Sequence, residues 1–275
     1  MAIIQNIGLM ITRNEEDVIT EVMTEISKYF EIVLVMDNST DKTREIIEAY
    51  PCVKYIVNQK DIYGDMFITD GMRQHLLEKA QEMYGYEGWF TLLQGDEIFH
   101  SNPNTIIADA DIKGCEIVVW HSLQFFMHTS ERDGNEKLEL PVQQRRKWYS
   151  PGCYEERQFI NKKGLYYPLD QQRKCSPSGL NISKCYPYRP ILKHYHIRSE
   201  QQVLNRAKDR LATGFQLMYQ WVIDNGAYCD VHPGLSEARH VDNYPVENYS
   251  IACQITDNIL RKVYKLVQEK RNSEQ

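Results

Sequence analysis

Two adjacent carboxylates, Asp96 and Glu97, follow an apolar run at residues 89–93 after only two intervening residues. If that run is a β-strand, both side chains stand near its carboxyl end, and a divalent cation would relieve the repulsion between them. Mg2+ and Mn2+ prefer oxygen ligands such as carboxylates and phosphates. The pair therefore indicates a metal-assisted phosphate site, although a loop turn with a helix-capping aspartate explains the two residues equally well when they are considered alone.

Two histidines, His194 and His196, alternate along a short apolar run at residues 191–197. Alternate residues of a strand point to the same face, so both imidazoles can reach one site as metal ligands or general bases. The alternative is one structural histidine and one that faces solvent. Arg198 follows the pair, and its guanidinium could bind a phosphate in a bidentate fashion.

The elements that position these residues alternate along the first 97 residues. Apolar, strand-like runs at 7–11, 31–36, 53–57 and 89–93 are separated by helix-like segments at 15–30, 43–50 and 65–84. This order predicts a parallel sheet with helices on both faces, in which ligands bind outside the carboxyl ends of the strands. Polar residues should therefore converge from three strand ends: Thr12, Arg13, Asn14 and Glu15; Asp37, Asn38 and Ser39; and Asp96 and Glu97.

The second half of the chain has a different pattern. A strand or strand pair is expected at 116–127, a loop-rich region at 128–190, and helices at 200–225 and 250–269. We therefore divide the chain into an α/β part at 1–127, a middle part at 128–199 and a C-terminal helical extension at 200–275.

Composition limits the class of protein. The net charge is -6, which disfavours a protein that coats nucleic acid. The seven cysteines are an odd number without CxxC spacing, as expected of reduced thiols in a cytoplasmic protein. We expect neither a signal peptide nor a transmembrane helix, because no basic N-terminal segment and no run of 18 apolar residues occurs.

Phosphate-binding glycine motifs are missing from the sequence. It has no GxGxxG after the first strand and no GxxxxGK[ST], so pyrophosphate binding would rely on a metal ion and on arginine or lysine side chains.

Four segments together resemble glycosyltransferase family 2. Ile11-Thr12-Arg13-Asn14-Glu15-Glu16 resembles the opening signature of the family, and Val35–Thr43 resembles its D-x-S-x-D-x-T loop. Trp89–Phe99 resembles its D-x-D-E segment, with Gln94 in place of the first aspartate. Lys193–Ser199 resembles a late His-Tyr element of some members.

The resemblance implies a GT-A fold, a Rossmann-like nucleotide-binding α/β sheet flanked by helices, with a loop-rich acceptor region. It implies that a sugar moves from a nucleotide-sugar donor to a carbohydrate or glycoconjugate acceptor with inversion, assisted by Mn2+ or Mg2+. The predicted donor-binding residues are Thr12, Arg13, Asn14, Glu15, Asp37, Asn38, Arg73, Gln94, Gly95 and Arg198. The predicted metal ligands are Asp96, His194 and His196.

An inverting transfer needs a carboxylate that deprotonates the acceptor hydroxyl. Asp170 and Glu156 are the candidates, and Glu155 is a rival. Two other functions stay open. A nucleotidyltransferase is disfavoured by the missing glycine-rich loop, and a catalytically silent nucleotide-sugar or glycan-binding protein is suggested by Gln94.

Overall fold

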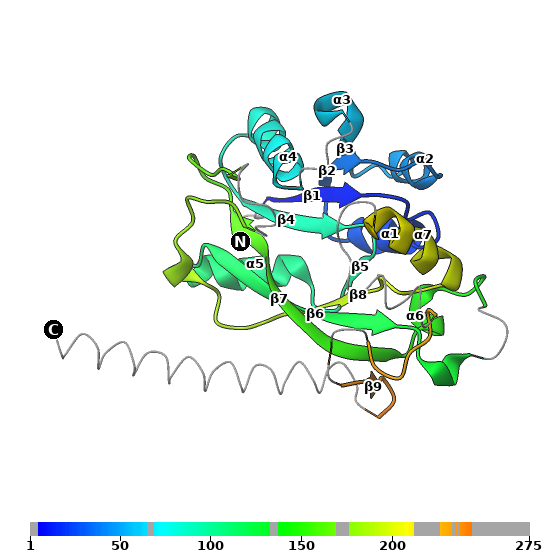
Figure 1. The fold of residues 1–275 in the computed structure, drawn as a ribbon. Coiled ribbons are helices and arrows are strands. Elements are labelled where there is room, and N and C mark those ends of the chain that lie inside the picture. Colours follow the sequence, from blue (N-terminus) through cyan, green and yellow to red (C-terminus); the bar gives the residue numbers. More distant parts are fainter. Residues whose placement is uncertain are drawn as a thin grey trace, which may run out of the picture.

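The computed structural model describes residues 5–64, 69–132, 137–168, 176–211, 226–232, 235 and 237–243. These residues form a nine-stranded sheet in the order β3-β2-β1-β4-β7-β6-β8-β5, with β9 paired to β7 (Figure 1). The strands are β1 (Asn6–Thr12), β2 (Ile32–Asp37), β3 (Val53–Asn58), β4 (Trp89–Gln94), β5 (Glu97–Phe99), β6 (Ile117–Phe126), β7 (Trp148–Ile160), β8 (Ile191–His194) and β9 (Arg239–His240). The helices are α1 (Ile19–Ile26), α2 (Thr43–Glu48), α3 (Gln59–Tyr63), α4 (Thr69–Tyr84), α5 (Pro103–Ile112), α6 (Val142–Arg145) and α7 (Glu200–Leu211), with short 3-10 turns at Thr129–Glu131 and Ile182–Lys184.

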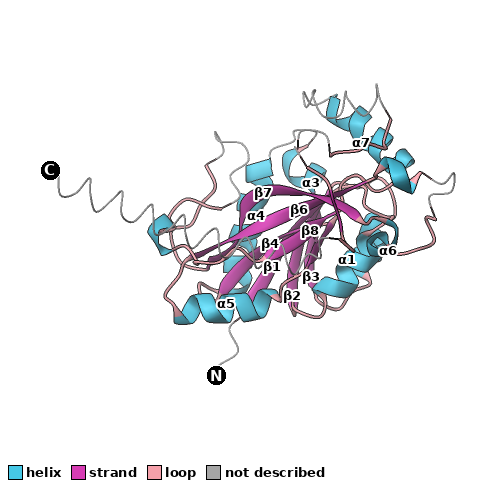
Figure 2. Ribbon diagram, turned by 90° about the horizontal axis from the view of Figure 1, so that it is seen from below, coloured by secondary structure: helices cyan, strands magenta, loops and turns pink. Residues whose placement is uncertain are grey.

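The first half of the sheet is parallel, as the sequence predicts. β1 pairs in parallel with both β2 and β4, and β2 pairs in parallel with β3. Strands β1, β2 and β4 are apolar runs because both of their faces are covered, whereas the edge strand β3 is half-buried. Val22, Met23 and Ile26 of α1 pack with one face of the sheet, whereas Met72 and Leu76 of α4 pack with the other. Figure 2 shows α1 and α5 on one side of the strands and α4 on the other. The predicted α/β fold class is confirmed.

The second half of the sheet is mixed. β7 pairs antiparallel with both β4 and β6, β6 pairs in parallel with β8, and β8 pairs antiparallel with β5. The sheet thus crosses the predicted boundary between residues 127 and 128, and the three-part division of the chain stays a prediction.

The thirteen-residue strand β7 lies inside the region that the sequence predicts to be rich in loops. That expectation is wrong for residues 148–160. The sequence does not predict this strand, because Pro151, Gly152 and the charged residues that follow interrupt the apolar alternation on which a strand prediction depends.

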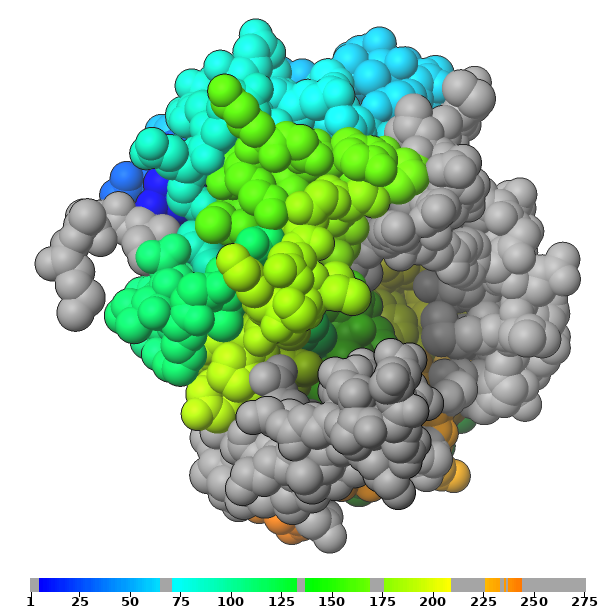
Figure 3. All heavy atoms as spheres, turned by 90° about the vertical axis from the view of Figure 1, so that its left-hand side faces the viewer, coloured from blue at the N-terminus to red at the C-terminus, as the bar shows by residue number. Residues whose placement is uncertain are grey.

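Residues 176–190 lie beside α5 on the face seen in Figure 3. The Tyr186 hydroxyl donates to Asp109 Oδ2 at 2.6 Å, and the Glu116 amide donates to the Lys184 carbonyl. Helix α7 occupies the first half of the helix predicted at 200–225, and the predicted helix at 250–269 lies outside the described residues. None of the helices in the described part of the chain is long and apolar enough to span a bilayer.

Candidate active site

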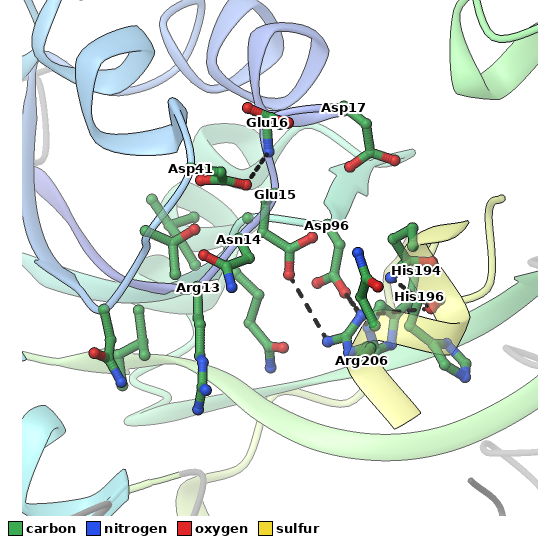
Figure 4. Close-up of a pocket in the computed structure, with 18 of the residues that line it drawn as sticks. Arg13, Asn14, Glu15, Glu16, Asp17, Asp41, Asp96, His194, His196 and Arg206 are labelled. Atoms are coloured by element: carbon green, nitrogen blue, oxygen red, sulfur yellow. Dashed lines mark hydrogen bonds and ion pairs between the residues drawn. The ribbon is translucent and has the colours of Figure 1, made fainter. Parts of the chain in front are cut away.

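A cavity of about 1040 Å3 opens at the carboxyl ends of β1 and β4. Strand β7, the end of β8 and the first turns of α7 complete its wall (Figure 4). The structure brings eleven of the predicted site residues to this cavity: Thr12, Arg13, Asn14, Glu15, Asn38, Arg73, Gln94, Gly95, Asp96, His194 and His196. The predicted convergence is therefore found for the ends of β1 and β4 and for Asn38, and it joins residues that lie far apart in the sequence. Asp37 and Glu97 do not line the cavity, and Glu97 is buried in an ion pair with Arg157.

Asn14 joins the loops that follow β1 and β2. Its backbone has a φ of 55°, a left-handed conformation that asparagine tolerates better than most residues. Its amide N–H donates to Ser39 Oγ at 2.9 Å, and its side-chain oxygen accepts from the Thr40 amide at 2.8 Å. Asn14 therefore holds the rim of the cavity in place as well as lining it.

Asp37 is predicted to bind the donor, but it does not line the cavity. The side chain is fully buried, and Oδ1 accepts from the Ser39 amide and from the Ser39 hydroxyl at 2.6 Å. In the described part of the chain Oδ2 has no hydrogen-bond partner. Burial raises the pKa of Asp37, and the two bonds from Ser39 oppose that rise. In this geometry Asp37 shapes the turn that carries Asn38 to the cavity.

The Gln94-Gly95 pair forms the floor of the cavity between β1 and β7. A Cβ atom on Gly95 would lie 2.6 Å from Thr12 Oγ1, so only glycine fits without movement of the neighbouring residues. The side-chain oxygen of Gln94 lies 2.8 Å from both terminal nitrogens of Arg157 once the amide is oriented to satisfy both groups. Gln94 is thus tied to an arginine from β7.

Asp96 is almost completely buried beside two cationic groups. Its Oδ2 accepts from Arg206 Nη1 at 2.8 Å and lies 3.2 Å from His194 Nε2. Burial by itself would raise the pKa of Asp96, but His194 and Arg206 outweigh it and hold the pKa well below its ordinary value. Asp96 in turn raises the pKa of His194 against the effect of burial. Asp96 is therefore ionised at neutral pH, and its carboxylate favours the protonated form of His194.

Arg198 is predicted to bind phosphate, but the structure places it behind the cavity wall. Its guanidinium is completely buried and donates to the carboxylates of Glu15 and Asp17 and, at 3.1 Å, to the Tyr195 carbonyl. Four N–H contacts to groups of the chain make Arg198 the partner of Glu15 in this geometry. Burial still raises the pKa of Glu15 to about 7 against the effect of Arg198.

The three predicted metal ligands do not share a common point in this geometry. His194 Nε2 lies 3.2 Å from Asp96 Oδ2, and His196 Nε2 lies 2.8 Å from His232 Nε2. Within the described ranges, no three His, Cys, Asp or Glu side chains are arranged to hold a metal ion. The arrangement of these residues does not fit a cation as it stands, and the divalent metal stays a prediction.

The candidates for the catalytic carboxylate are separated by their positions. Glu155 lines the cavity, forms an ion pair with Arg157 and accepts from Cys153 Sγ at 3.0 Å. Burial would raise the pKa of Glu155, but Arg157 outweighs it and the pKa is lowered. Glu156, its neighbour on β7, does not line the cavity, and Asp170 lies outside the described residues.

Two of the four arginines that line the cavity, Arg157 and Arg206, are missing from the predicted site residues. Arg157 lies within the unrecognised strand β7. Arg206 could have been predicted from the sequence, because the polar residues Ser199, Gln202 and Arg206 recur at helical spacing directly after the His194 segment. All three line the cavity at the start of α7.

Comparison with known proteins identifies the first part of this architecture. Residues 9–64, from β1 to α3, match the family model described as glycosyl transferase family 2. No curated protein sequence matches the chain.

Among solved structures, two crystal structures of S. aureus TarS are similar. One is a complex of residues 1–349 with UDP-GlcNAc, at 20% identity and a TM-score of 0.35, and covers 46% of this chain and 36% of that chain. The other is 13% identical with a TM-score of 0.43, and covers 75% of this chain and 40% of that chain. The matched part of this chain thus spans well under half the length of either TarS chain. The match to the glycosyl transferase family 2 model covers residues 9–64, which include two of the four segments that resemble this family, residues 11–16 and 35–43.

Proposed function

We propose that this protein is a glycosyltransferase that moves a sugar from a nucleoside diphosphate donor to a hydroxyl of a carbohydrate or glycoconjugate, with inversion. The observation that carries the proposal is the cavity itself. It opens at the strand ends of the family 2 region, and four arginines line it: Arg13, Arg73, Arg157 and Arg206. Guanidinium groups bind phosphate oxygens through paired N–H donors. A volume of about 1040 Å3 is at the upper end for pockets that enclose a small-molecule ligand.

In this proposal the donor lies along the ends of β1 and β4. The acceptor approaches from β7, where Glu155 faces the same cavity. The acceptor hydroxyl gives its proton to Glu155 while its oxygen attacks the anomeric carbon. The bond from that carbon to the phosphate oxygen breaks, and the nucleoside diphosphate leaves with the bonding electrons. The arginines stabilise the charge that develops on the leaving group.

Glu155 suits the role of base because a base must be ionised before it accepts a proton. The lowered pKa of Glu155 satisfies this requirement at neutral pH. The same ion pair with Arg157 weakens Glu155 as a base, so a bound substrate would have to draw Arg157 away for full activity. Asp170 and Glu156 remain rival predictions.

The test is turnover of a panel of UDP, GDP, dTDP and CMP sugars, scored for transfer and for hydrolysis. Loss of a general base costs about 100- to 10,000-fold in rate. We expect Glu155→Gln to lose activity on that scale and to keep nucleotide binding. Glu87→Gln, an exposed glutamate that does not line the cavity, is the matched control.

The outcomes separate the alternatives. If Glu155→Gln stays active while Asp170→Asn or Glu156→Gln does not, the base is assigned wrongly. Binding of a nucleotide sugar without any turnover would favour the silent binding protein, and absence of nucleotide binding would refute the proposed donor site.

A further inference from the structure

Arg206 occupies the point where the two buried carboxylates of the cavity floor come closest to α7. Its Nη1 donates to Asp96 Oδ2 at 2.8 Å, and its Nη2 lies 3.8 Å from Glu15 Oε1. Nη1 also lies 3.4 Å from the His196 carbonyl oxygen. Figure 4 shows the guanidinium facing Glu15 from the end of β1 and Asp96 from the end of β4. The side chain is 18% exposed and lines the cavity.

The carboxylate charges at this point are shared among three cations of the chain. Glu15 contacts Arg198 through Oε2, which leaves Oε1 directed at Arg206. Asp96 contacts His194 and Arg206 through the same oxygen. Arg206 therefore supplies positive charge to two strand ends at once. A divalent cation bound between an acidic residue and a diphosphate would neutralise negative charge in the same way.

Gln94, two residues before Asp96, also weakens the case for a bound cation. An acidic side chain there would add a negative charge for a cation, but Gln94 is neutral and its oxygen faces Arg157. Of the two buried carboxylates of the floor, Glu15 is already in contact with Arg198, and Asp96 is already in contact with Arg206. Metal affinity depends strongly on the number of charged ligands, so these two features both weaken the case for a required metal.

We propose that Arg206 binds the diphosphate of the donor and takes the place of a divalent cation at Asp96, so that nucleotide binding does not require metal. The proposal rests on the proposed function of the cavity. A guanidinium carries five N–H groups in a planar fork. Arg206 contacts Asp96 through Nη1 and lines the cavity, so a phosphate in the cavity can accept from the same guanidinium while Asp96 holds it at that position.

The test measures the dissociation constants of UDP, GDP and dTDP by calorimetry, with EDTA and with Mn2+, on the full chain. For the wild type we expect one nucleotide to bind in EDTA, with less than a threefold change on addition of Mn2+. Arg206→Gln should weaken binding in EDTA by about 10- to 100-fold, because hydrogen bonds to charged groups contribute on that scale. Lys208→Gln is the matched control, since it removes a positive charge from an exposed position of the same helix and does not line the cavity.

Loss of Arg206 also releases Asp96, which makes a second prediction in the same experiment. Mn2+ should restore nucleotide binding to Arg206→Gln by several-fold while it leaves the wild type nearly unchanged. Arg206→Lys keeps the charge without the fork and should bind with intermediate affinity. Circular dichroism of each variant shows that it is folded, and the wild-type comparison of EDTA with Mn2+ holds even if a variant is not.

Nucleotide binding by the wild type only in the presence of Mn2+ would overturn this inference and leave the proposed function intact. Equal affinities of Arg206→Gln and the wild type in EDTA would do the same. If no nucleotide binds under either condition, both the inference and the proposed donor site fail.

Discussion

Replacement of Arg198 by methionine tests whether this residue supports the site from behind or binds phosphate. Arg198 is fully buried, and its guanidinium contacts Glu15, whose side chain is 7% exposed, and Asp17, which is 31% exposed. Breaking a buried ion pair by removal of one partner costs about 3–5 kcal/mol. The more exposed contact with Asp17 adds at most about 1 kcal/mol. We therefore expect Arg198→Met to lower the free energy of unfolding by about 3–5 kcal/mol at pH 8.

The destabilisation should depend on pH in a defined direction. Without Arg198, the buried carboxyl of Glu15 has a pKa further above its ordinary value of 4.5 than it has in the wild type. An acid whose pKa is raised in the folded state lowers stability as pH rises from its ordinary pKa to the raised pKa. Urea denaturation of the wild type and of Arg198→Met should therefore show a smaller difference at pH 5.5 than at pH 8.

A double-mutant cycle completes the test. Glu15→Gln removes the charge that Arg198 neutralises, so the double variant should be more stable than the sum of the single losses predicts. The expected coupling is about 1–3 kcal/mol. A loss below about 1 kcal/mol for Arg198→Met at pH 8, or additive losses in the cycle, would refute the assignment of Arg198 as the buried partner of Glu15.

Two further variants test the floor of the cavity. Gly95→Ala places a methyl group 2.6 Å from Thr12 Oγ1 and 3.0 Å from Glu15 Cγ. We expect a free energy of unfolding that is lower by about 1–3 kcal/mol in thermal denaturation and weaker nucleotide binding in calorimetry. Unchanged values in both measurements would contradict the close packing at Gly95. Glu97 has a pKa raised to about 7 because burial outweighs Arg157, so ionisation of Glu97 destabilises the fold as pH rises from 4.5 through 7, by up to about 3 kcal/mol at 1.36 kcal/mol per pKa unit. Glu97→Gln should therefore gain stability relative to the wild type between pH 5 and pH 8 in urea titrations, and a difference that does not change with pH would show that the carboxyl is ionised throughout.

The parallel half of the fold could be predicted from the sequence because each of its strands is recognisable from its own residues. Strands β1, β2 and β4 are covered on both faces, so each is a short apolar run, and the polar residue that ends each run marks the carboxyl edge. This is why the residues from Thr12 to Glu15 and the Gln94–Asp96 segment were found. Strand β7 escaped detection because its strand character depends on pairing with β4 and β6 and not on its own composition.

The partners of the charged residues could not be read from the sequence. Arg198 contacts Glu15 across 183 positions, and Arg206 contacts Asp96 across 110. A sequence shows that an arginine follows a histidine pair, but whether it faces a ligand or a carboxylate depends on which distant element packs against it. Arg198 and Arg206 are eight residues apart. Arg198 is buried behind the cavity wall, whereas Arg206 lines the cavity.

This distribution of charge also shows why the family 2 region cannot form the site by itself. Residues 9–64 supply Glu15, and β4 leads to Asp96, so both buried carboxylates come from the first hundred residues. Their cationic partners come from the end of β8 and the segment that follows it: Arg198 contacts Glu15, and His194 and Arg206 contact Asp96. A buried carboxylate without a partner is strongly unfavourable, so the N-terminal half depends on the packed C-terminal segment to stabilise the ionised forms of Asp96 and Glu15. The chemistry of the cavity and the stability of its floor therefore depend on the same few ion pairs, and each pair joins one half of the chain to the other.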